Sequence, residues 1–108
     1  MLAVIFEVEM NPGRSEEYFD LAGTLRPELE AIDGFISVER FQSMSTQGKY
    51  VSLSFWRDEK AVRTWREHAQ HRLAQAKGKS EIFADFRIRV AEVVRDYSLS
   101  DSSADSRD

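Results

Sequence analysis

The sequence predicts an α+β domain of the ferredoxin-like type, with the order β-α-β-β-α-β, a four-stranded antiparallel sheet and both helices on one face. Four stretches alternate apolar and polar residues, which is the pattern of a half-buried strand. Two longer stretches repeat apolar residues at spacings of three and four, which is the pattern of an amphipathic helix. The order of these stretches along the 108 residues is that of a split βαβ arrangement.

The first strand and helix are indicated by a change of period around a turn. Residues 2–10 alternate as a strand, and Asn11-Pro12-Gly13 has turn composition. A serine and two glutamates then resemble a helix N-terminus, and an apolar stripe predicts a helix over residues 15–32. Pro27 lacks an N–H and its ring clashes with the preceding turn, so we expect a kink or split near Gly23.

The middle of the chain predicts a hairpin followed by a second helix. Gly34 indicates the end of the first helix, because a glycine that adopts a left-handed backbone conformation commonly terminates a helix. Residues 35–41 and 49–56 alternate again, and the polar connection between them predicts a β-hairpin. Asp58 can cap a second helix, which we expect to run over residues 59–77 and to end at a glycine.

The last strand is expected to be unusually long. Alternation runs from residue 82 to about residue 97, whereas a typical strand has about five or six residues. One of its faces consists of Ile82, Ala84, Phe86, Ile88, Val90 and Val94. The sheet face away from the helices is expected to carry Ile5, either Phe35 and Phe41 or Ile36 and Val38, and some of Phe83, Ala91, Val93 and Tyr97. Because apolar faces and overhanging strands seek a partner, we expect a homodimer.

The composition excludes several classes of protein. The chain has no cysteine, which excludes disulfides, thiolate zinc sites, iron–sulfur clusters and a cysteine nucleophile. Its net charge of −4 shows no basic footprint for nucleic acid, and no run approaches the roughly 18 apolar residues of a membrane span. We therefore expect a cytoplasmic protein with no nucleic-acid or membrane partner. It would consist of one domain over residues 1–97 and a disordered tail over residues 98–108.

Two histidines, His68 and His71, are the candidates for proton transfer near neutral pH. On an unbroken helix His68 lies nearer the apolar side and His71 nearer solvent, although a bend between them would change this. The alternative is that both are surface residues. A metal site with Glu67 lacks a third ligand and does not match the His-Glu-x-x-His pattern, so we expect neither a metal nor a cofactor.

Aromatic residues could wall a cavity between the helices and the sheet. Trp56, Trp65 and Phe6 are the candidates, and the alternative is that the tryptophans are simply core. Arg87 and Arg89 could hold an anion, or could pair with acids on neighbouring strands. Since the sequence has no Gly-rich phosphate loop and no nucleophile elbow, catalysis would depend on a shaped apolar pocket and one general base.

Several segments taken together make the chain similar to the antibiotic biosynthesis monooxygenase group of dimeric α+β barrel proteins, over about residues 2–97. These segments are Asn11-Pro12-Gly13, Asp33-Gly34-Phe35-Ile36-Ser37-Val38-Glu39-Arg40-Phe41, Ser52-Leu53-Ser54-Phe55-Trp56, Trp65-Arg66-Glu67-His68 with His71, and Val94-Arg95-Asp96-Tyr97. The resemblance implies a homodimer with a pocket between sheet and helices in each subunit. Some members oxidise polycyclic aromatic or quinol-like compounds with O2 and without metal or flavin.

The resemblance also implies roles for individual residues. Trp65 would wall the pocket, and His71 or His68 would be the base. In related haem-degrading members a helix histidine ligates iron and an asparagine orients the bound oxygen. Phe6 stands at or near that asparagine position, which counts against haem degradation.

The leading hypothesis is therefore a cofactor-independent monooxygenase that oxidises a small aromatic or quinol-like compound with O2. The alternatives are a haem-binding or haem-degrading protein and a non-enzymatic dimeric domain that binds a small ligand. A cavity smaller than roughly 300 Å³ beside Trp65 would favour the non-enzymatic alternative.

Overall fold

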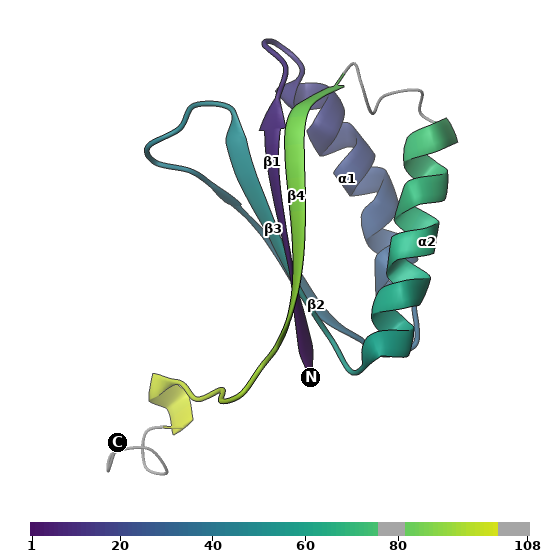
Figure 1. Cartoon of the computed structure of the whole chain (residues 1–108), viewed down its shortest axis with the longest axis vertical. Helices are drawn as coiled ribbons and strands as arrows, with labels where there is room; N and C mark the ends of the chain where they lie inside the picture. Colours follow the sequence, from purple (N-terminus) through teal and green to yellow (C-terminus); the bar gives the residue numbers. More distant parts are fainter. Residues whose placement is uncertain (76–81, 102–108) are drawn as a thin grey trace.

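The chain forms one sheet and two long helices, in the order predicted from the sequence. The computed structural model describes residues 1–75 and 82–101. Its elements are β1 (Leu2–Met10), α1 (Ser15–Glu30), β2 (Phe35–Gln42), β3 (Lys49–Trp56), α2 (Glu59–Gln75), β4 (Phe83–Glu92) and a short 3-10 helix, η1 (Leu99–Asp101). Both helices cover the same face of the sheet (Figure 1), so the ferredoxin-like prediction is confirmed. The expected end of α2 at Gly78 and the tail from residue 102 lie outside the described residues.

The sheet has the strand order β2-β3-β1-β4, and every neighbouring pair is antiparallel. In the central strand β1, Ile5 lies opposite Leu53 of β3 and Arg89 of β4. Because successive side chains of a strand point to opposite faces, this register places Val4 and its even-numbered neighbours against the helices. Within the described residues, neither helix is long and apolar enough to cross a membrane.

The core between the helices and the sheet is divided into two clusters. One cluster gathers around Trp56 and Trp65, whose ring centroids lie 6.2 Å apart. The other gathers around Val8, Tyr18 and Phe83. Residues of both clusters line a single cavity, so the core is not filled continuously from one end of the sheet to the other.

Helix α1 is continuous through Pro27, and the expected split near Gly23 is wrong. Pro27 lies one turn before the helix ends at Glu30, so the missing N–H removes only one hydrogen bond near the terminus. The two cap predictions fared better: Gly34 has a φ of +97°, and the Ala61 N–H donates to the Asp58 carboxylate at 3.0 Å.

Strand β4 ends at Glu92, so the predicted extension to about Tyr97 is wrong. Glu92 lies opposite Leu2, where β1 begins, and one further hydrogen bond joins the Val93 N–H to the Met1 carbonyl at 3.0 Å. A strand persists only while a neighbour supplies hydrogen bonds, so the alternation beyond residue 93 has nothing to pair with. The chain then runs past the sheet on the side away from the helices (Figure 1).

An irregularity in the β1–β4 ladder also changes one predicted face. The register shifts between Glu9 and Met10, which places Phe83 opposite Met10. Phe83 is therefore buried on the helix side, with its ring 6.1 Å from that of Phe86, and the expectation that it could face away is wrong. A bulge changes which residues share a face because it inserts one residue into the two-residue period.

The sheet face opposite the helices carries apolar side chains, as predicted for Ile5. Leu53 lies beside Ile5, and Phe41 of β2 is on the same face and 46% exposed. Neither predicted pair of outward residues on β2 is right, because the register shifts between Phe35 and Ser37. Phe35 packs against Trp56 and Val38 lines the cavity, so of the two pairs only Phe41 is established on the outward face. We call this helix-free surface the open face.

Candidate functional site

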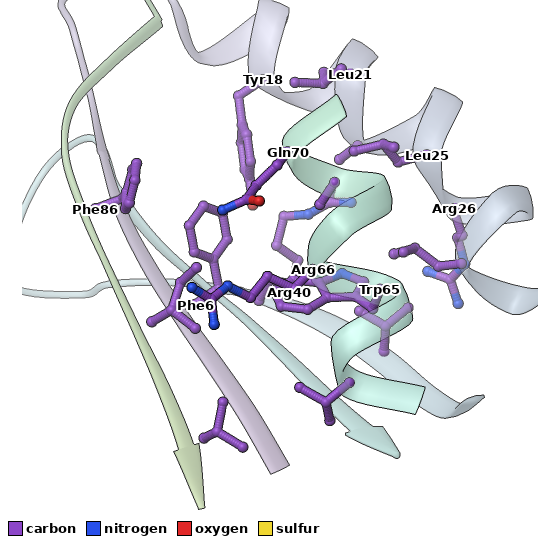
Figure 2. A pocket seen from close by; sticks show the side chains of 18 of the residues that line it. Phe6, Tyr18, Leu21, Leu25, Arg26, Arg40, Trp65, Arg66, Gln70 and Phe86 are labelled. Atoms are coloured by element: carbon purple, nitrogen blue, oxygen red, sulfur yellow. The ribbon is translucent and has the colours of Figure 1, made fainter. Parts of the chain in front are cut away.

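A cavity of about 580 Å³ lies between the two helices and the sheet. Its volume is within the range of about 300–1,000 Å³ that small-molecule sites occupy. All four strands and both helices contribute side chains to it. Among them are Phe6 and Phe86 from the sheet, Leu21 and Leu25 from α1, and Trp65 and Gln70 from α2 (Figure 2).

The walls of the cavity are mainly apolar and aromatic. The aromatic rings are those of Phe6, Tyr18, Trp65, Phe83 and Phe86, with Phe6 and Phe86 separated by 5.9 Å between centroids. Aliphatic side chains of Leu25 and other residues complete the surface. A wall of this kind recognises the rings and hydrocarbon parts of a ligand by burying them.

Helix α2 faces the cavity with a stripe of residues at spacings of three and four. The stripe consists of Glu59, Val62, Arg63, Arg66, Ala69 and Gln70, with the buried Trp65 at its edge. Because a helix turns about every 3.6 residues, these positions share one side. The start of this helix is rich in charged residues, a composition typical of a solvent-exposed helix. For this reason Arg63 and Arg66 were not predicted as site residues.

Tyr18 is the buried phenol of the site, at 5% exposure. Burial raises the pKa of Tyr18, and the nearby positive charge of Arg40 partly opposes that rise. The Arg40 guanidinium carbon lies 5.5 Å from the centre of the Tyr18 ring and 5.8 Å from that of Phe19. These cation–π contacts hold a charged group at the edge of an aromatic surface. Neither residue was singled out from the sequence, since they come together only through the pairing of α1 with β2.

His68 bridges the two helices and does not line the cavity. Its imidazole contacts the Glu28 carboxylate of α1, and Arg72 donates to the same carboxylate at 2.9 Å. The three side chains are about one-third exposed, so this cluster ties α1 to α2 at their outer edge. The expected contribution of His68 to the pocket is not present in this geometry.

His71 is exposed, and among the described residues no histidine belongs to the cavity lining. Helix α2 is unbroken from Glu59 to Gln75, so the bend that could have turned His71 inward does not occur. A haem in this cavity would have no histidine ligand from the described residues. The described lining therefore does not fit the histidine-ligated haem of that alternative.

The two tryptophans have different positions. Trp65 lines the cavity, as does Phe6. Trp56 does not line it, because its indole is fully buried behind Trp65 and Phe35, and its Nε1 donates to Ser54 Oγ at 2.9 Å. Trp56 thus follows the core alternative, and it supports the cavity from behind.

A second group of polar residues lies on the open face, next to Ile5. Glu7 of β1 pairs with Lys49 of β3, at 3.3 Å, and with Arg89 of β4. The hydrogen bond from Lys49 is the main reason that the pKa of Glu7 is lowered, with Arg89 adding to it. Arg89 therefore follows the cross-strand pairing alternative.

Comparison with known proteins gives a family. Residues 1–77 match the family model described as antibiotic biosynthesis monooxygenase. The chain is 47% identical over 93 residues to the jasmonate monooxygenase ABM of Pyricularia oryzae, which covers 86% of this chain and 43% of that protein. It is 31% identical over 72 residues to the uncharacterized protein YqjZ of Bacillus subtilis, which covers 67% of this chain and 61% of that protein. The chain thus spans less than two thirds of either relative.

Solved structures agree in fold. Rv0793 from Mycobacterium tuberculosis superimposes with a TM-score of 0.75 at 20% identity, over 90% of this chain and 98% of that one. PA3566 from Pseudomonas aeruginosa gives 0.73 at 18% identity, over 87% and 94%. At such identities the likeness concerns the fold alone, whereas the family model and the Pyricularia relative concern the sequence. The chain belongs to the antibiotic biosynthesis monooxygenase family.

Proposed function

We propose that the chain is a monooxygenase that oxidises a small ring-containing organic compound with O2 in the cavity beside Trp65. The observation that carries the proposal is the cavity of about 580 Å³, which lies between the helices and the sheet and is walled by Trp65, Phe6 and Phe86. The family match and the monooxygenase name of the Pyricularia relative support the reaction class. A cavity smaller than roughly 300 Å³ would favour the non-enzymatic alternative, and the observed cavity is larger than this.

Two substrate classes follow from these supports. An electron-rich aromatic or quinol-like compound can react without a cofactor, because it supplies the electrons itself. In such a compound, O2 can convert a CH2 group beside a deprotonated enol into a carbonyl. One oxygen atom of O2 then enters the product, and the other leaves as water together with the two hydrogens of the CH2 group. Jasmonate is the second candidate, from the name of the Pyricularia relative. Hydroxylation of such a compound needs two further electrons, so it requires an added two-electron donor such as NADPH.

The protein's own part in this chemistry is to bind and orient the ring and to accept a proton. Trp65 and Phe6 supply ring contacts. For the proton, Glu59 is the one carboxylate of the lining in residues 1–75 and 82–101, whereas His68 is held by Glu28 and His71 is exposed. His68 and His71 remain the bases proposed from the family resemblance, and the geometry adds Glu59 as their competitor.

Oxygen uptake tests the proposal. The panel comprises anthrones and hydroquinones without a reductant, and jasmonic acid with NADPH. The matched variants are Trp65→Phe, Glu59→Gln, His68→Ala and His71→Ala. We expect Trp65→Phe to lower kcat/KM by about tenfold through loss of ring contact, and one of the three other variants to abolish proton transfer at neutral pH. Oxygen consumption that does not depend on the protein, across the whole panel, would reject the function.

We also propose that the protein acts as a homodimer formed through the open face. Ile5, Leu53 and Phe41 provide an apolar surface there, and a small domain gains stability by covering such a surface. Each subunit would keep its own cavity, because the helices lie on the other side of the sheet (Figure 1).

A further inference from the structure

The lining of the cavity is cationic, although the chain as a whole is acidic. Its net charge is −4, from 19 acidic and 15 basic residues. Among the described residues, the lining contains four arginines and one carboxylate, that of Glu59. The arginines come from three elements: Arg26 from α1, Arg40 from β2, and Arg63 and Arg66 from α2. Since acids outnumber bases elsewhere, composition does not account for this concentration of positive charge.

The four arginines differ in how far their charge is already satisfied. Arg26 pairs with Glu30 at 3.2 Å, and Arg40 is stacked on Tyr18. Arg63 and Arg66 have no ion pair within the part of the chain that the structure describes. They are three residues apart on one helix side, where like charges repel. Glu59 lies one turn before Arg63 and offsets at most one of these charges.

An arginine on an exposed helix often only extends its head into water and covers apolar surface with its stem. The arrangement here differs in that charges from both a helix and a strand border one apolar cavity, with aromatic rings beside them (Figure 2). Among the residues that the structure describes, the basic side chains of the lining are all arginines and none is a lysine. The planar guanidinium fork suits a carboxylate, which it can bind through two parallel hydrogen bonds.

We propose that the ligand of this cavity is an apolar ring compound that carries a single carboxylate. Its hydrocarbon part packs on Trp65 and Phe6, and its carboxylate binds Arg66, with Arg40 and Arg63 contributing further positive charge. This ligand class would be the substrate class of the monooxygenase proposed above. The oxidation of such a ligand therefore rests on that proposed function, whereas its binding does not. Jasmonate, a cyclopentanone carboxylate, belongs to this class, whereas a neutral anthrone does not.

The test compares acids with their neutral esters by isothermal titration of the intact chain. One pair is jasmonic acid and methyl jasmonate, and a second pair with another skeleton is 1-naphthoic acid and methyl 1-naphthoate. We expect at least one acid to bind about tenfold or more tightly than its ester at low salt, and this preference to shrink as salt is raised. Arg66→Gln should remove most of the preference while leaving ester binding unchanged, which also shows that the variant is folded.

Arg87→Gln is the matched control, because Arg87 lies on the open face and not on the cavity. It should leave both the acid and the ester affinities unchanged. Equal binding of acid and ester in both pairs, or no binding in either pair, would overturn the carboxylate assignment. The monooxygenase proposal would survive that result if oxygen uptake occurred with a neutral quinol, so the two failures are distinguishable.

Discussion

At the scale of single residues, Gly34 is the position where the fold tolerates the least change. Its φ of +97° is a conformation that side chains rarely adopt, and a Cβ placed there would lie 2.7 Å from Cβ of Ala61. The Gly34 carbonyl also accepts a hydrogen bond from the Arg57 N–H at 2.7 Å, so the backbone cannot move away freely. This glycine allows the start of β2 to lie directly against α2.

We predict that Gly34→Ala lowers the free energy of unfolding by about 1–3 kcal/mol, because it combines backbone strain with a steric clash. Urea denaturation followed by circular dichroism measures the change. Gly23→Ala is the control: this glycine is inside α1 with open space around it, so alanine should raise stability by about 0.5–1 kcal/mol. Equal effects at the two positions would contradict the assignment.

Arg57 joins two turns through carboxylates on either side of it. Its guanidinium donates to both oxygens of Asp33, at 3.1 and 3.2 Å, and its Nε donates to Asp58 at 3.1 Å. The hydrogen bond from Arg57 is the main cause of the lowered pKa of Asp33. For Asp58 the backbone N–H of Ala61 is the main cause, and Arg57 comes second.

A lowered pKa has a defined consequence for stability against pH. The two carboxylates contribute stability that is present above the ordinary aspartate pKa of about 3.9 and is lost as the pH falls through the lower folded values. We predict that the melting temperature falls less steeply below about pH 5 in Arg57→Gln than in the wild type. Arg95→Gln, outside the sheet, should follow the wild-type curve. If the melting temperatures of Arg57→Gln and the wild type fell in parallel with pH, the interaction of Arg57 with Asp33 and Asp58 would not be linked to folding.

At the scale of elements, α2 presents different sides to different neighbours. Val62 and Trp65 pack on the sheet, Arg66 and Gln70 face the cavity, and His68 faces α1. A helix with an apolar stripe this narrow depends on tertiary packing, because its intrinsic stability in water is small. The division explains why neither histidine lines the cavity, even though both are on the helix that walls it.

Strand β4 contributes both to the sheet and to the cavity, and Val93 adds one last hydrogen bond to the sheet. Ile88 and Val90 line the cavity, while Val94 is 80% exposed. We predict that truncation after Arg89 abolishes cooperative unfolding and the dimer, because it removes the pairing of Leu2 with Glu92. Truncation after Val93 should keep the fold and move the melting temperature by less than about 5 °C.

Thermal circular dichroism and size-exclusion chromatography of the two truncated chains check this prediction. Removal of residues 99–108 alone should leave both the fold and the dimer intact. A cooperative transition in the chain that ends at Arg89 would show that the last residue pairs between β1 and β4 are dispensable for folding. Loss of folding in the chain that ends at Val93 would show that residues 94–98 stabilise the subunit.

At the scale of the whole molecule, the two faces of the sheet have different roles. The helix side holds the core and the cavity. The open face is apolar around Leu53 and charged around Glu7, where Lys49 and Arg89 meet it. An apolar region beside a rim of charges is the usual anatomy of a protein interface.

If the open face forms the homodimer, a charge at its centre should break it. We predict that Leu53→Glu converts the dimer to a folded monomer at micromolar concentration, since burying an unpaired carboxylate is costly. Analytical ultracentrifugation measures the mass. Glu67→Gln, an exposed position on α2 on the other side of the sheet, is the control and should leave the dimer unchanged. A wild-type protein that sediments as a monomer would reject the interface.

The sequence by itself determined the order of elements, because alternation and helical spacing are local properties that a core imposes on each segment. It also determined the helix cap at Asp58, the left-handed Gly34 and the position of Ile5 on the face away from the helices. Phe6 and Trp65 could be predicted as cavity residues for the same reason, since each is on the apolar side of its own element.

Only the tertiary structure decided where β4 ends, which side Phe83 faces and which polar groups meet in the cavity. The end of β4 depends on the length of β1, and the side of Phe83 depends on a bulge in their shared ladder. The cavity arginines come from α1, β2 and α2, so no local pattern marks them as one group. Contacts between distant segments have no period along the chain, and the physical cause of a binding site is often such a contact.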